Sequence, residues 1–480
     1  MRSVRLLWAF CTSLPVIVIS SCDSERIVAP EVTLRLLPEA PNLFVGSIIR
    51  LSPFDVAGTP STDPALKWSS SAPGVASVDA AGRITGKSIG SATIRVISAT
   101  GFGEVMVTVS GGGASVRSWG STTCGVASAG DLYCWGLNDF GQTGTGNRNT
   151  PVQVPIKVAG GLTFTSVAPA LEHTCGIATS GTYCWGNNWA GQVGDGTSDG
   201  VRLAPTKVAT GEVFTQVSTQ SNNQSRFILD CSERICVARS CGITAAGTLF
   251  CWGDMTLLPV SAGLAKPFRA ISLGLHYVCG LDRANLAYCW GRSDSKQTSG
   301  FLIAGTQPPP VPGNRYFQSI STGFSHNCAL DFDGDVYCWG ANDAGQLGAP
   351  SSETCGISFP IFYIQCRGVP VRVEADYKFL SVTVAGRHTC AIATTLQVLC
   401  WGSNSSGQLG SASGQSSQAP VPVPNAQRFR SVTAGLGHTC AVTLDGDAYC
   451  WGFNSSGQLG NGTITSSSVP TLVTGGFKFR

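Results

Sequence analysis

A cysteine-containing hairpin pattern that occurs seven times constrains the fold of this 480-residue chain more than any other feature. In its last copy, two runs of β-forming residues flank Leu444-Asp445-Gly446, a turn whose third position needs a left-handed backbone that glycine adopts easily. This turn places Cys440 opposite Cys450, with Cα atoms about 4.5 Å apart. A disulfide can span that distance. Each copy therefore predicts a hairpin, its register and a cross-strand disulfide.

The seven copies follow one another at intervals of about 50 residues, and in each the second cysteine is followed by Trp-Gly. The predicted disulfides join Cys124 to Cys134, Cys175 to Cys184, Cys241 to Cys251, Cys279 to Cys289, Cys328 to Cys338, Cys390 to Cys400 and Cys440 to Cys450. Asn285 replaces the turn glycine in the fourth copy, and Leu396 departs from the pattern in the sixth. Several short strands per repeat are typical of a β-propeller. We therefore predict an all-β protein in which residues 114–480 form a seven-bladed propeller.

The segment after each Trp-Gly carries a second motif. Trp401-Gly-Ser-Asn-Ser-Ser-Gly-Gln-Leu-Gly410 and Trp451–Gly460 resemble the repeat of the regulator of chromosome condensation family. The third repeat lacks the Gly-Gln-Leu-Gly loop after Trp252, and the fourth carries a degenerate version. The resemblance implies a propeller but not an activity, since its members include a nucleotide exchange factor, a secreted β-lactamase inhibitor and bacterial surface proteins.

The first residues have the pattern of a secretory signal. A basic start, Met1-Arg-Ser-Val-Arg5, precedes the apolar run Leu6–Ile19, which is too short for a comfortable membrane span. The run ends in Ile19-Ser-Ser-Cys22, which resembles the lipobox of bacterial lipoproteins. The resemblance implies a signal peptide at 1–21, a lipid on Cys22 and a tether at 22–30. The alternative is an ordinary signal cleaved nearby.

Residues 31–110 form a separate cysteine-free unit. Trp68-Ser-Ser-Ser-Ala-Pro-Gly-Val-Ala-Ser-Val-Asp79 and the glycines that follow resemble the group 2 bacterial immunoglobulin-like domain. We expect Trp68 to fill the space between two sheets, together with Val75, Val78, Ile84, Ile94 and Val96. The family implies a spacer or adhesin-like module at the cell surface. Gly111-Gly112-Gly113 then provides a flexible linker.

Four cysteines remain once Cys11 in the signal, Cys22 and the hairpin pairs are set aside. They lie in two insertions, one holding Cys231 and Cys236 and the other Cys355 and Cys366. An even number of cysteines favours disulfides and an oxidising compartment, although the pairing within the insertions stays open. Zinc is the alternative, but a hairpin offers only two thiols and the other blades lie too far away to complete a tetrahedral site. We predict no metal and no cofactor.

The polar residues predict no catalytic site. The five histidines, His173, His276, His326, His388 and His438, precede first cysteines in separate repeats, so we expect them to ring the axis as structural hydrogen-bonding groups. Asp331-Phe-Asp-Gly-Asp335 resembles the start of a calcium loop, but Asn342 stands where a bidentate Glu is needed. No nucleophile elbow or phosphate-binding loop is present. A formal net charge of +3 gives no electrostatic basis for binding nucleic acid.

The leading hypothesis is a binding or scaffold protein, not an enzyme. It would be anchored to the membrane by its lipid, on the extracytoplasmic side of the bacterial cell envelope. Its propeller would recognise an extracytoplasmic protein or glycan. The alternatives are a lyase or hydrolase acting on polysaccharide and, less favoured, a nucleotide exchange factor. Strand parity places both insertions on one face, away from Asp333-Gly334. The second insertion carries Phe359, Phe362 and Tyr363, an apolar cluster that we predict contacts the partner.

The chain also offers one first strand too many. A phenylalanine begins this strand in six repeats, at Phe164, Phe214, Phe268, Phe317, Phe379 and Phe429. Phe477-Lys-Phe-Arg480 matches them, while Ser115-Val116 supplies an imperfect first strand for the first repeat. Eight candidates for seven places predict that the C-terminal strand joins the N-terminal blade.

Overall fold

The computed structural model describes residues 34–38, 41–55, 58–61, 63, 65–99, 101–110, 116–221, 238–299, 307–357, 362–424 and 427–479. Every regular element within these ranges is a β-strand. The described part thus has no helix long and apolar enough to cross a membrane. The predicted signal and lipidated tether (1–30), the glycine linker (111–113) and the first insertion's Cys231 and Cys236 lie outside the described residues.

The N-terminal strands form three sheets among the described residues of 34–110. Their bounds are β1 (Leu34–Leu37), β2 (Asn42–Phe44), β3 (Ile48–Arg50), β4 (Ser52–Asp55), β5 (Lys67–Ser70), β6 (Ala76–Val78), β7 (Arg83–Gly86), β8 (Gly90–Ile97) and β9 (Phe102–Ser110). The sheet orders are β1-β4, β2-β9-β8-β5 and β3-β7-β6, with β2 parallel to β9. Ile84, Ile94 and Val96 are completely buried. Trp68, Val75 and Val78 are only partly buried and pack against the edge of this core.

Residues 116–479 form seven further sheets in chain order within the described ranges. The first three contain β10 (Val116–Trp119), β11 (Thr122–Val126), β12 (Leu132–Gly136) and β13 (Val152–Lys157); β14 (Phe164–Pro169), β15 (His173–Ala178), β16 (Gly181–Asn187) and β17 (Val201–Lys207); and β18 (Phe214–Ser221), β19 (Ala238–Thr244), β20 (Leu249–Gly253) and β21 (Thr256–Ser261). Each is a four-stranded antiparallel meander, so consecutive strands pair along the chain.

The remaining four sheets vary this pattern. They contain β22 (Phe268–Gly274), β23 (Tyr277–Asp282) and β24 (Ala287–Gly291); β25 (Phe317–Thr322), β26 (His326–Asp331), β27 (Val336–Ala341), β28 (Glu353–Ile357) and β29 (Phe362–Arg372); β30 (Phe379–Val384), β31 (His388–Ala393), β32 (Val398–Gly402) and β33 (Ser417–Pro422); and β34 (Phe429–Ala434), β35 (His438–Thr443), β36 (Ala448–Gly452) and β37 (Ser467–Leu472). The fourth sheet has three strands, and the fifth has five because the second insertion adds β28.

The second and third strands of each sheet form the predicted hairpin. In the seventh, the Thr443 N–H donates to the Asp447 carbonyl, and Gly446 has φ +89°. The two cysteines of each hairpin face each other in register and form a disulfide, with Cα atoms 4.1 Å apart in every pair. The disulfides join Cys124 to Cys134, Cys175 to Cys184, Cys241 to Cys251, Cys279 to Cys289, Cys328 to Cys338, Cys390 to Cys400 and Cys440 to Cys450. Leu396 departs from the pattern in residue type only. Its backbone adopts the left-handed conformation of the other turns, with φ +66°.

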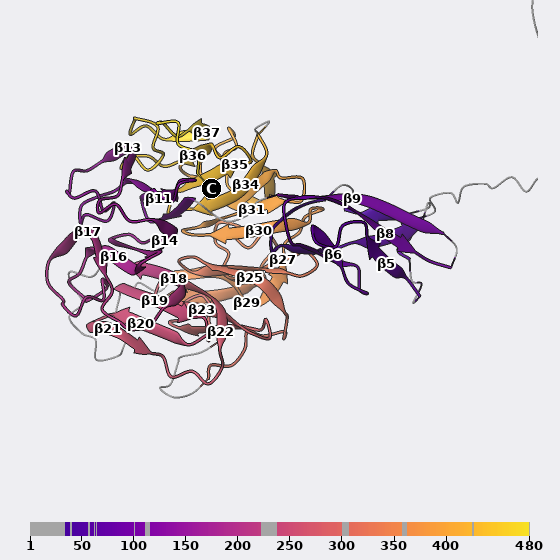
Figure 1. Cartoon of the computed structure of the whole chain (residues 1–480), viewed down its shortest axis with the longest axis horizontal. Coiled ribbons are helices and arrows are strands. Elements are labelled where there is room, and N and C mark those ends of the chain that lie inside the picture. Colours follow the sequence, from indigo (N-terminus) through magenta and orange to yellow (C-terminus); the bar gives the residue numbers. More distant parts are fainter. Residues whose placement is uncertain are drawn as a thin grey trace, which may run out of the picture.

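The seven sheets follow one another in a circle, so that the last lies beside the first (Figure 1). The Ser118 N–H in β10 donates to Thr433 Oγ1 in β34 at 3.0 Å. The C-terminal segment also joins the first sheet, as predicted, because Phe479 forms a β-bridge with Ala127 and its N–H donates to Gly446 O. Phe479 is buried and thereby takes the place that a first-strand phenylalanine occupies in the other sheets.

Tryptophan side chains connect neighbouring sheets. The indole Nε1–H of Trp451 donates to the Gln408 carbonyl at 3.0 Å. In this way the glutamine of a Gly-Gln-x-Gly loop accepts a hydrogen bond from the tryptophan of the next sheet. The other bonds of this kind are Trp135–Gln458, Trp185–Gln142, Trp252–Gln192, Trp339–Gln297 and Trp401–Gln346. Gln297 belongs to the degenerate fourth loop, which therefore keeps this function. The third repeat lacks the loop and offers Trp290 no glutamine of this kind.

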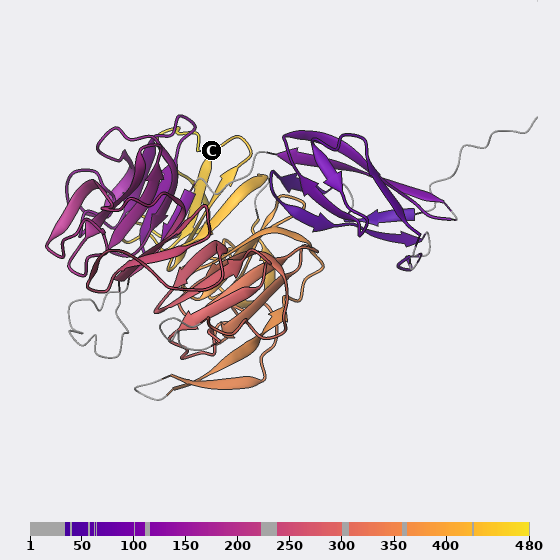
Figure 2. The same ribbon diagram turned by 60° about the horizontal axis from the view of Figure 1, so that its bottom comes forward.

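The N-terminal sheets lie against one end of the circle (Figure 2). The Gln318 side chain, at the start of β25, accepts from the Ile48 N–H at 3.2 Å and donates to the Ile48 carbonyl at 3.0 Å. Asp333, in the turn between β26 and β27, lies 3.8 Å from Arg50 Nη1 and 4.0 Å from Arg83 Nε. The N-terminal sheets therefore contact the end of the circle that carries the Asp333 turn.

Candidate functional site

The second insertion projects from the opposite end of the circle. β27 begins beside the Asp333 turn and ends at Ala341, where it pairs with Cys366 of β29. The N-terminal part of β29, which precedes Cys366, extends past the end of β27 and pairs only with β28. This pairing runs from Gln365↔Thr354 to Phe362↔Ile357. The β28–β29 hairpin therefore extends away from the N-terminal sheets (Figure 2). The pairing of β18 with β19 ends at Ser221↔Ala238, which lies at this same end of the circle. The two residues that flank the first insertion are therefore at this end too.

The β28–β29 hairpin is held at its base and presents an aromatic side chain above it. A disulfide joins Cys355 to Cys366, and Lys296 Nζ forms an ion pair with Glu353 at 2.9 Å. Tyr363 is 77% exposed. Of the other two predicted contact residues, Phe359 lies outside the described residues and the side chain of Phe362 is not described. The structure thus places Tyr363 on an exposed, covalently supported hairpin.

A second exposed aromatic side chain lies in the loop between β16 and β17, which is at the same end. Trp189 is 61% exposed and occupies a position where the corresponding loops carry Asp139, Asp343, Ser405 and Ser455. Trp189 was not among the residues predicted from the sequence, although its departure from the repeat pattern is visible there. Met255, in the β20–β21 turn, is also 61% exposed and donates its N–H to Ala190 O, beside Trp189.

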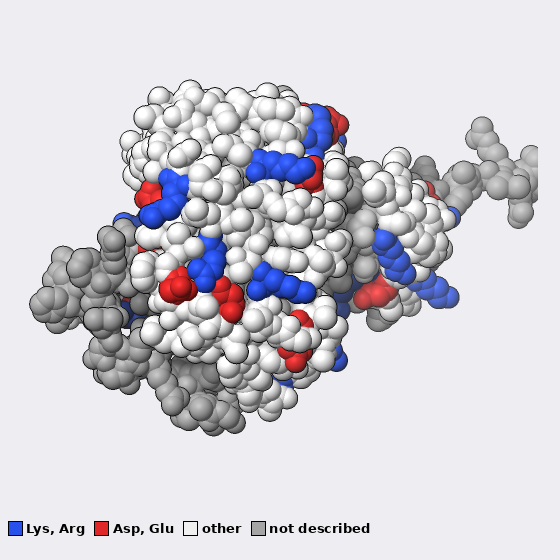
Figure 3. Space-filling view, turned by 60° about the vertical axis from the view of Figure 1, so that its left-hand side comes forward, with Lys and Arg blue, Asp and Glu red and all other residues white. Residues whose placement is uncertain are grey.

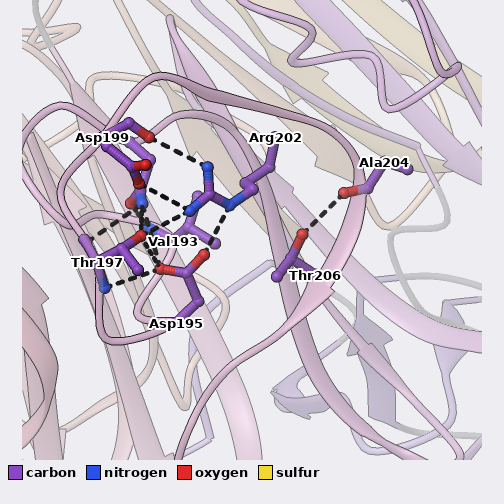
Figure 4. A network of polar contacts seen from close by, with 8 residues as sticks. Val193, Asp195, Thr197, Asp199, Arg202, Ala204 and Thr206 are labelled. Carbon is purple, nitrogen blue, oxygen red and sulfur yellow. Dashed lines mark hydrogen bonds and ion pairs between the residues drawn. The ribbon is translucent and has the colours of Figure 1, made fainter.

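A network of polar contacts fixes the Trp189 loop (Figure 4). Arg202 Nε lies 2.7 Å from Asp195 Oδ2, and its Nη2 lies 3.0 Å from Asp199 Oδ1. The Thr197 hydroxyl and the Asn188 amide both donate to Asp195 Oδ1. Partial burial acts to raise the pKa of Asp195, but the hydrogen bonds from Thr197 and Arg202 and the Arg202 charge together outweigh it, so the pKa is lowered. The loop next to Trp189 is therefore ordered by charge-assisted hydrogen bonds before any partner binds.

The histidines are structural groups in the described part of the chain. His438 is completely buried, and its Nε2 lies 2.9 Å from Thr123 Oγ1 of the next sheet. Because that hydroxyl donates to the Gln458 carbonyl, Nε2 carries the proton and Nδ1 is left without a partner. His173, His326 and His388 make the same contact with Ser240, Thr389 and Thr439. Burial lowers the pKa of His438 to about 3, so its imidazole is neutral.

The prediction that all five histidines occupy equivalent places is wrong for His276. The other four lie two residues before the first cysteine, whereas His276 lies three before Cys279 and adopts φ +66°. Tyr277 occupies the equivalent position, and its hydroxyl lies 2.8 Å from Asn327 Oδ1 of the next sheet. A tyrosine therefore makes the connection between the fourth and fifth sheets that histidine makes elsewhere.

Within the described residues there is no metal cluster, and the face drawn in Figure 3 carries no large patch of one charge. No group of three or more His, Cys, Asp or Glu side chains could hold a metal ion within the described ranges. Asp331 Oδ1 accepts from the N–H groups of Asp333 and Asp335 at 2.9 Å each, so this carboxylate closes the hairpin turn. In the view of Figure 3, basic and acidic side chains are scattered over a mostly uncharged surface, several of them beside a side chain of opposite charge.

Comparison with protein families matches both parts of the chain. Residues 129–177, 333–392, 397–442 and 445–479 match the regulator of chromosome condensation (RCC1) repeat. A second description of the same repeat matches residues 317–346 and 429–458. Residues 52–109 match the bacterial Ig-like domain (group 2).

Comparison with solved structures identifies the fold. Prp20p from Saccharomyces cerevisiae, whose crystal structure was described with its binding to Gsp1p and histones, is 20% identical, with TM-score 0.60 over 72% of this chain and 86% of that chain. Human WBSCR16 is 18% identical, with TM-score 0.61 over 72% of this chain and 96% of that chain. Such identities establish similarity of fold alone. The chain therefore combines RCC1 repeats in an all-β, propeller-like fold with a bacterial Ig-like domain of group 2.

Proposed function

We propose that this chain is an extracytoplasmic binding protein that uses the end of the propeller opposite the N-terminal domain to hold a protein partner. We call this surface the free end and define it by Tyr363, Trp189 and Met255 and the loops that carry them. The observation that carries the proposal is the pairing of exposed aromatic side chains with rigid loops at this end. Exposed Trp and Tyr side chains are the residues that most often supply binding energy at protein interfaces.

Two further observations support the free end as the binding surface. Gln318, Arg50, Arg83 and Asp333 join the N-terminal domain to the other end, which limits access to that surface. The Cys355–Cys366 disulfide and the Asp195–Arg202 ion pair order two loops of the free end. Ordering a loop before binding lowers the entropy that association must overcome.

The proposal is tested with the lipid-free protein, used to capture partners from the native cell envelope. Replacing Phe359, Phe362 and Tyr363 together by Ser, or Trp189 alone by Ser, removes candidate contacts from exposed loops and leaves the melting curve unchanged. Capture should weaken at least about tenfold, as expected for loss of a binding hot spot. Asp333→Ser is the matched control at the covered end. Loss of capture through Asp333→Ser alone contradicts the proposal, and capture of carbohydrate alone changes the partner class to a glycan.

We also infer that the seven sheets are the blades of a closed seven-bladed propeller spanning 114–480, and that residues 31–110 form an Ig-like sandwich. The bond from Ser118 to Thr433 and the Ala127–Phe479 bridge support ring closure. The three N-terminal sheets and the match at 52–109 support the sandwich. Limited proteolysis between the units, at 111–113, should release two separately folded fragments. A single cooperative unfolding transition in which neither fragment survives cleavage contradicts these boundaries.

Anchoring through Cys22 is part of the same proposal. The disulfide content and the group 2 bacterial Ig-like match support an extracytoplasmic location in the bacterial cell envelope. Cys22→Ala should abolish incorporation of a clickable fatty acid, because that thiol is the acyl acceptor of the lipobox-like motif. Cys11→Ala, within the predicted signal, is the control and should label as wild type does. Equal labelling of the Cys22→Ala variant and wild type refutes the lipid anchor.

A further inference from the structure

A polar chamber of about 640 Å³ lies where the first strands of the seven sheets converge. Residues of β10, β14, β18, β22, β25, β30 and β34 line it, together with Val45-Gly46-Ser47 of the N-terminal domain. Its walls are rich in Ser and Thr and include two arginines, Arg117 and Arg430, but no Asp or Glu is among the described residues that line it. A volume of this size is typical of sites that bind small molecules.

A ring of small side chains surrounds the axis at the depth of Arg117. The residue paired with the first cysteine of each hairpin stands at this depth, and in six sheets it is Ala168, Ser218, Ser272, Ser321, Thr383 or Thr433. In the first sheet the residue paired with Cys124 is Arg117. The first sheet therefore projects a long cation from a position that the other sheets fill with a methyl or hydroxyl group.

The hydroxyl ring has a structural function that Arg117 does not share. Each hydroxyl accepts a hydrogen bond from a backbone N–H of the next sheet at 3.0–3.3 Å. The five pairs are Ser218–Leu273, Ser272–Thr322, Ser321–Val384, Thr383–Ala434 and Thr433–Ser118. The residue of the second sheet that would donate to position 117 is Pro169, which has no N–H. Arg117 and Pro169 thus stand where the other sheets have a hydroxyl and a backbone N–H. The Arg117 side chain therefore takes no part in the hydrogen bonds of the ring.

No charged partner among the described residues compensates Arg117. Its side chain is exposed to the chamber, yet protein surrounds the chamber, and this burial away from bulk water lowers the pKa of the guanidinium. Among the described residues no acid and no hydrogen-bond acceptor offsets that effect. Arg430 donates through Nη2 to the Phe479 carbonyl, while its Nε is buried without a partner. The Ser381 hydroxyl is also buried without a partner. The chamber therefore offers cationic and hydroxyl donors but little negative charge.

Residues of other elements border both ends of the chamber. At one end Trp119, which follows Arg117 by two residues, meets Phe324 from the fifth sheet edge to face, with ring centroids 5.8 Å apart. Ala170, Ala385 and Ala434 pack around this aromatic pair. At the other end stands the Val45-Gly46-Ser47 turn of the N-terminal domain. Because protein atoms surround Arg117 within the chamber, its attraction to an anion is stronger here than on an open surface.

We propose that this chamber binds a small molecule or ion bearing an oxyanion, with the Arg117 guanidinium as its principal ligand. A guanidinium presents two parallel N–H groups, which match the oxygen spacing of carboxylate, phosphate or sulfate. This site is independent of the free end, so loss of one leaves the other intact.

The test measures the melting temperature of the full-length protein against increasing phosphate, sulfate or glucuronate, with ionic strength held constant by chloride. A ligand that binds the folded state raises the melting temperature to an extent set by its concentration and affinity. At least one of the three oxyanions should give a saturable rise. No response beyond that of chloride overturns the proposal.

Two variants assign the site to Arg117. Arg117→Ser should lower oxyanion affinity at least tenfold, while Lys207→Ser, which removes a surface cation, should not change it. Arg117→Ser combined with Pro169→Ala supplies both members of the missing donor–acceptor pair. This double variant should melt no lower than wild type without oxyanion, because it adds a sixth hydroxyl–N–H pair to the ring while Ala168 still lacks a hydroxyl, and it should not respond to oxyanions. Retention of the response in either Arg117 variant overturns the assignment.

Discussion

The turn of the sixth hairpin shows how packing can outweigh a backbone preference. Leu396 occupies a left-handed conformation that glycine or asparagine takes in most of the other hairpins, at a cost of roughly 1–2 kcal/mol for an ordinary residue. Its side chain, however, is only 1% exposed and packs in a core that includes Phe429. Loss of a buried leucine side chain typically costs about 2–5 kcal/mol. The packing term is larger, which explains why a branched residue is compatible with this turn.

We therefore expect Leu396→Gly to destabilise the protein, although it restores the residue preferred for the turn. The net loss in free energy of unfolding should be about 1–3 kcal/mol, the difference between the packing and backbone effects. Urea unfolding with an unchanged slope measures it. Gly446→Ala, which adds backbone strain without removing a buried side chain, is the comparison. A Leu396→Gly variant more stable than wild type contradicts this account.

At the scale of the strand, neutral histidines connect the second strand of one sheet to that of the next. Burial lowers the pKa of His173, His326 and His438 to about 3 and that of His388 to about 4. In the unfolded chain a histidine has a pKa of about 6.5. Between these values the unfolded state binds more protons than the folded state, so stability is greatest above pH 6.5 and falls as the pH is lowered.

The free energy of unfolding should therefore decrease between pH 6.5 and pH 4 by up to about 1.4 kcal/mol per pH unit for each of these histidines. His438→Gln removes one titrating group, so its stability should depend less steeply on pH, even if it is less stable at pH 7. Urea midpoints at pH 7 and pH 5 measure the difference in slope. Leu444→Ala, in an exposed turn position without a titrating group, should keep the wild-type slope. Identical slopes for His438→Gln and wild type would show that this histidine is already protonated in the folded state.

The hairpins, their register and the structural role of the histidines could be predicted because each depends on residues close together in the repeat. The cross-sheet contacts of the histidines were not predicted, since His438 and Thr123 lie 315 positions apart. Tyr277 was missed as the replacement for histidine, although its two-residue spacing from Cys279 is visible in the sequence. Arg117 could not be recognised as unusual, because its equivalence to Thr433 emerges only from the strand register. The docking of Gln318 and Asp333 against the N-terminal domain brings together residues about 270 positions apart, as for Gln318 and Ile48, and no local pattern indicates it.

For the whole molecule, the C-terminal segment completes the first sheet. Phe479 is 1% exposed, and its ring centroid lies 5.9 Å from that of Trp135. The ring centroids of Phe477 and Tyr133 lie 4.1 Å apart. Both contacts join the final residues to strands formed by residues near position 130. Neither phenylalanine contributes to the seventh sheet as a paired strand.

Truncation after Gly475 should lower the melting temperature by several degrees, because it exposes the apolar surface that Phe477 and Phe479 cover. Differential scanning calorimetry provides the measurement. Lys478→Ala removes only an exposed ion pair with Asp447 and should have little effect. A melting curve unchanged by truncation would show that these final contacts add nothing to the stability of the circle.

The same contacts impose an order on biogenesis. A ribosome makes the strands of the first sheet early, but the phenylalanine that covers them is added more than 300 residues later, since Ala127 pairs with Phe479. Sheets two to seven can each form as soon as their own strands are available. The first sheet keeps part of its apolar surface uncovered until Phe479 has been made. During that time a chaperone or an incorrect partner strand could bind this surface. For a chain exported in an unfolded form, the arrival of the segment that contains Phe479 would decide whether the molecule closes on itself or on a neighbour.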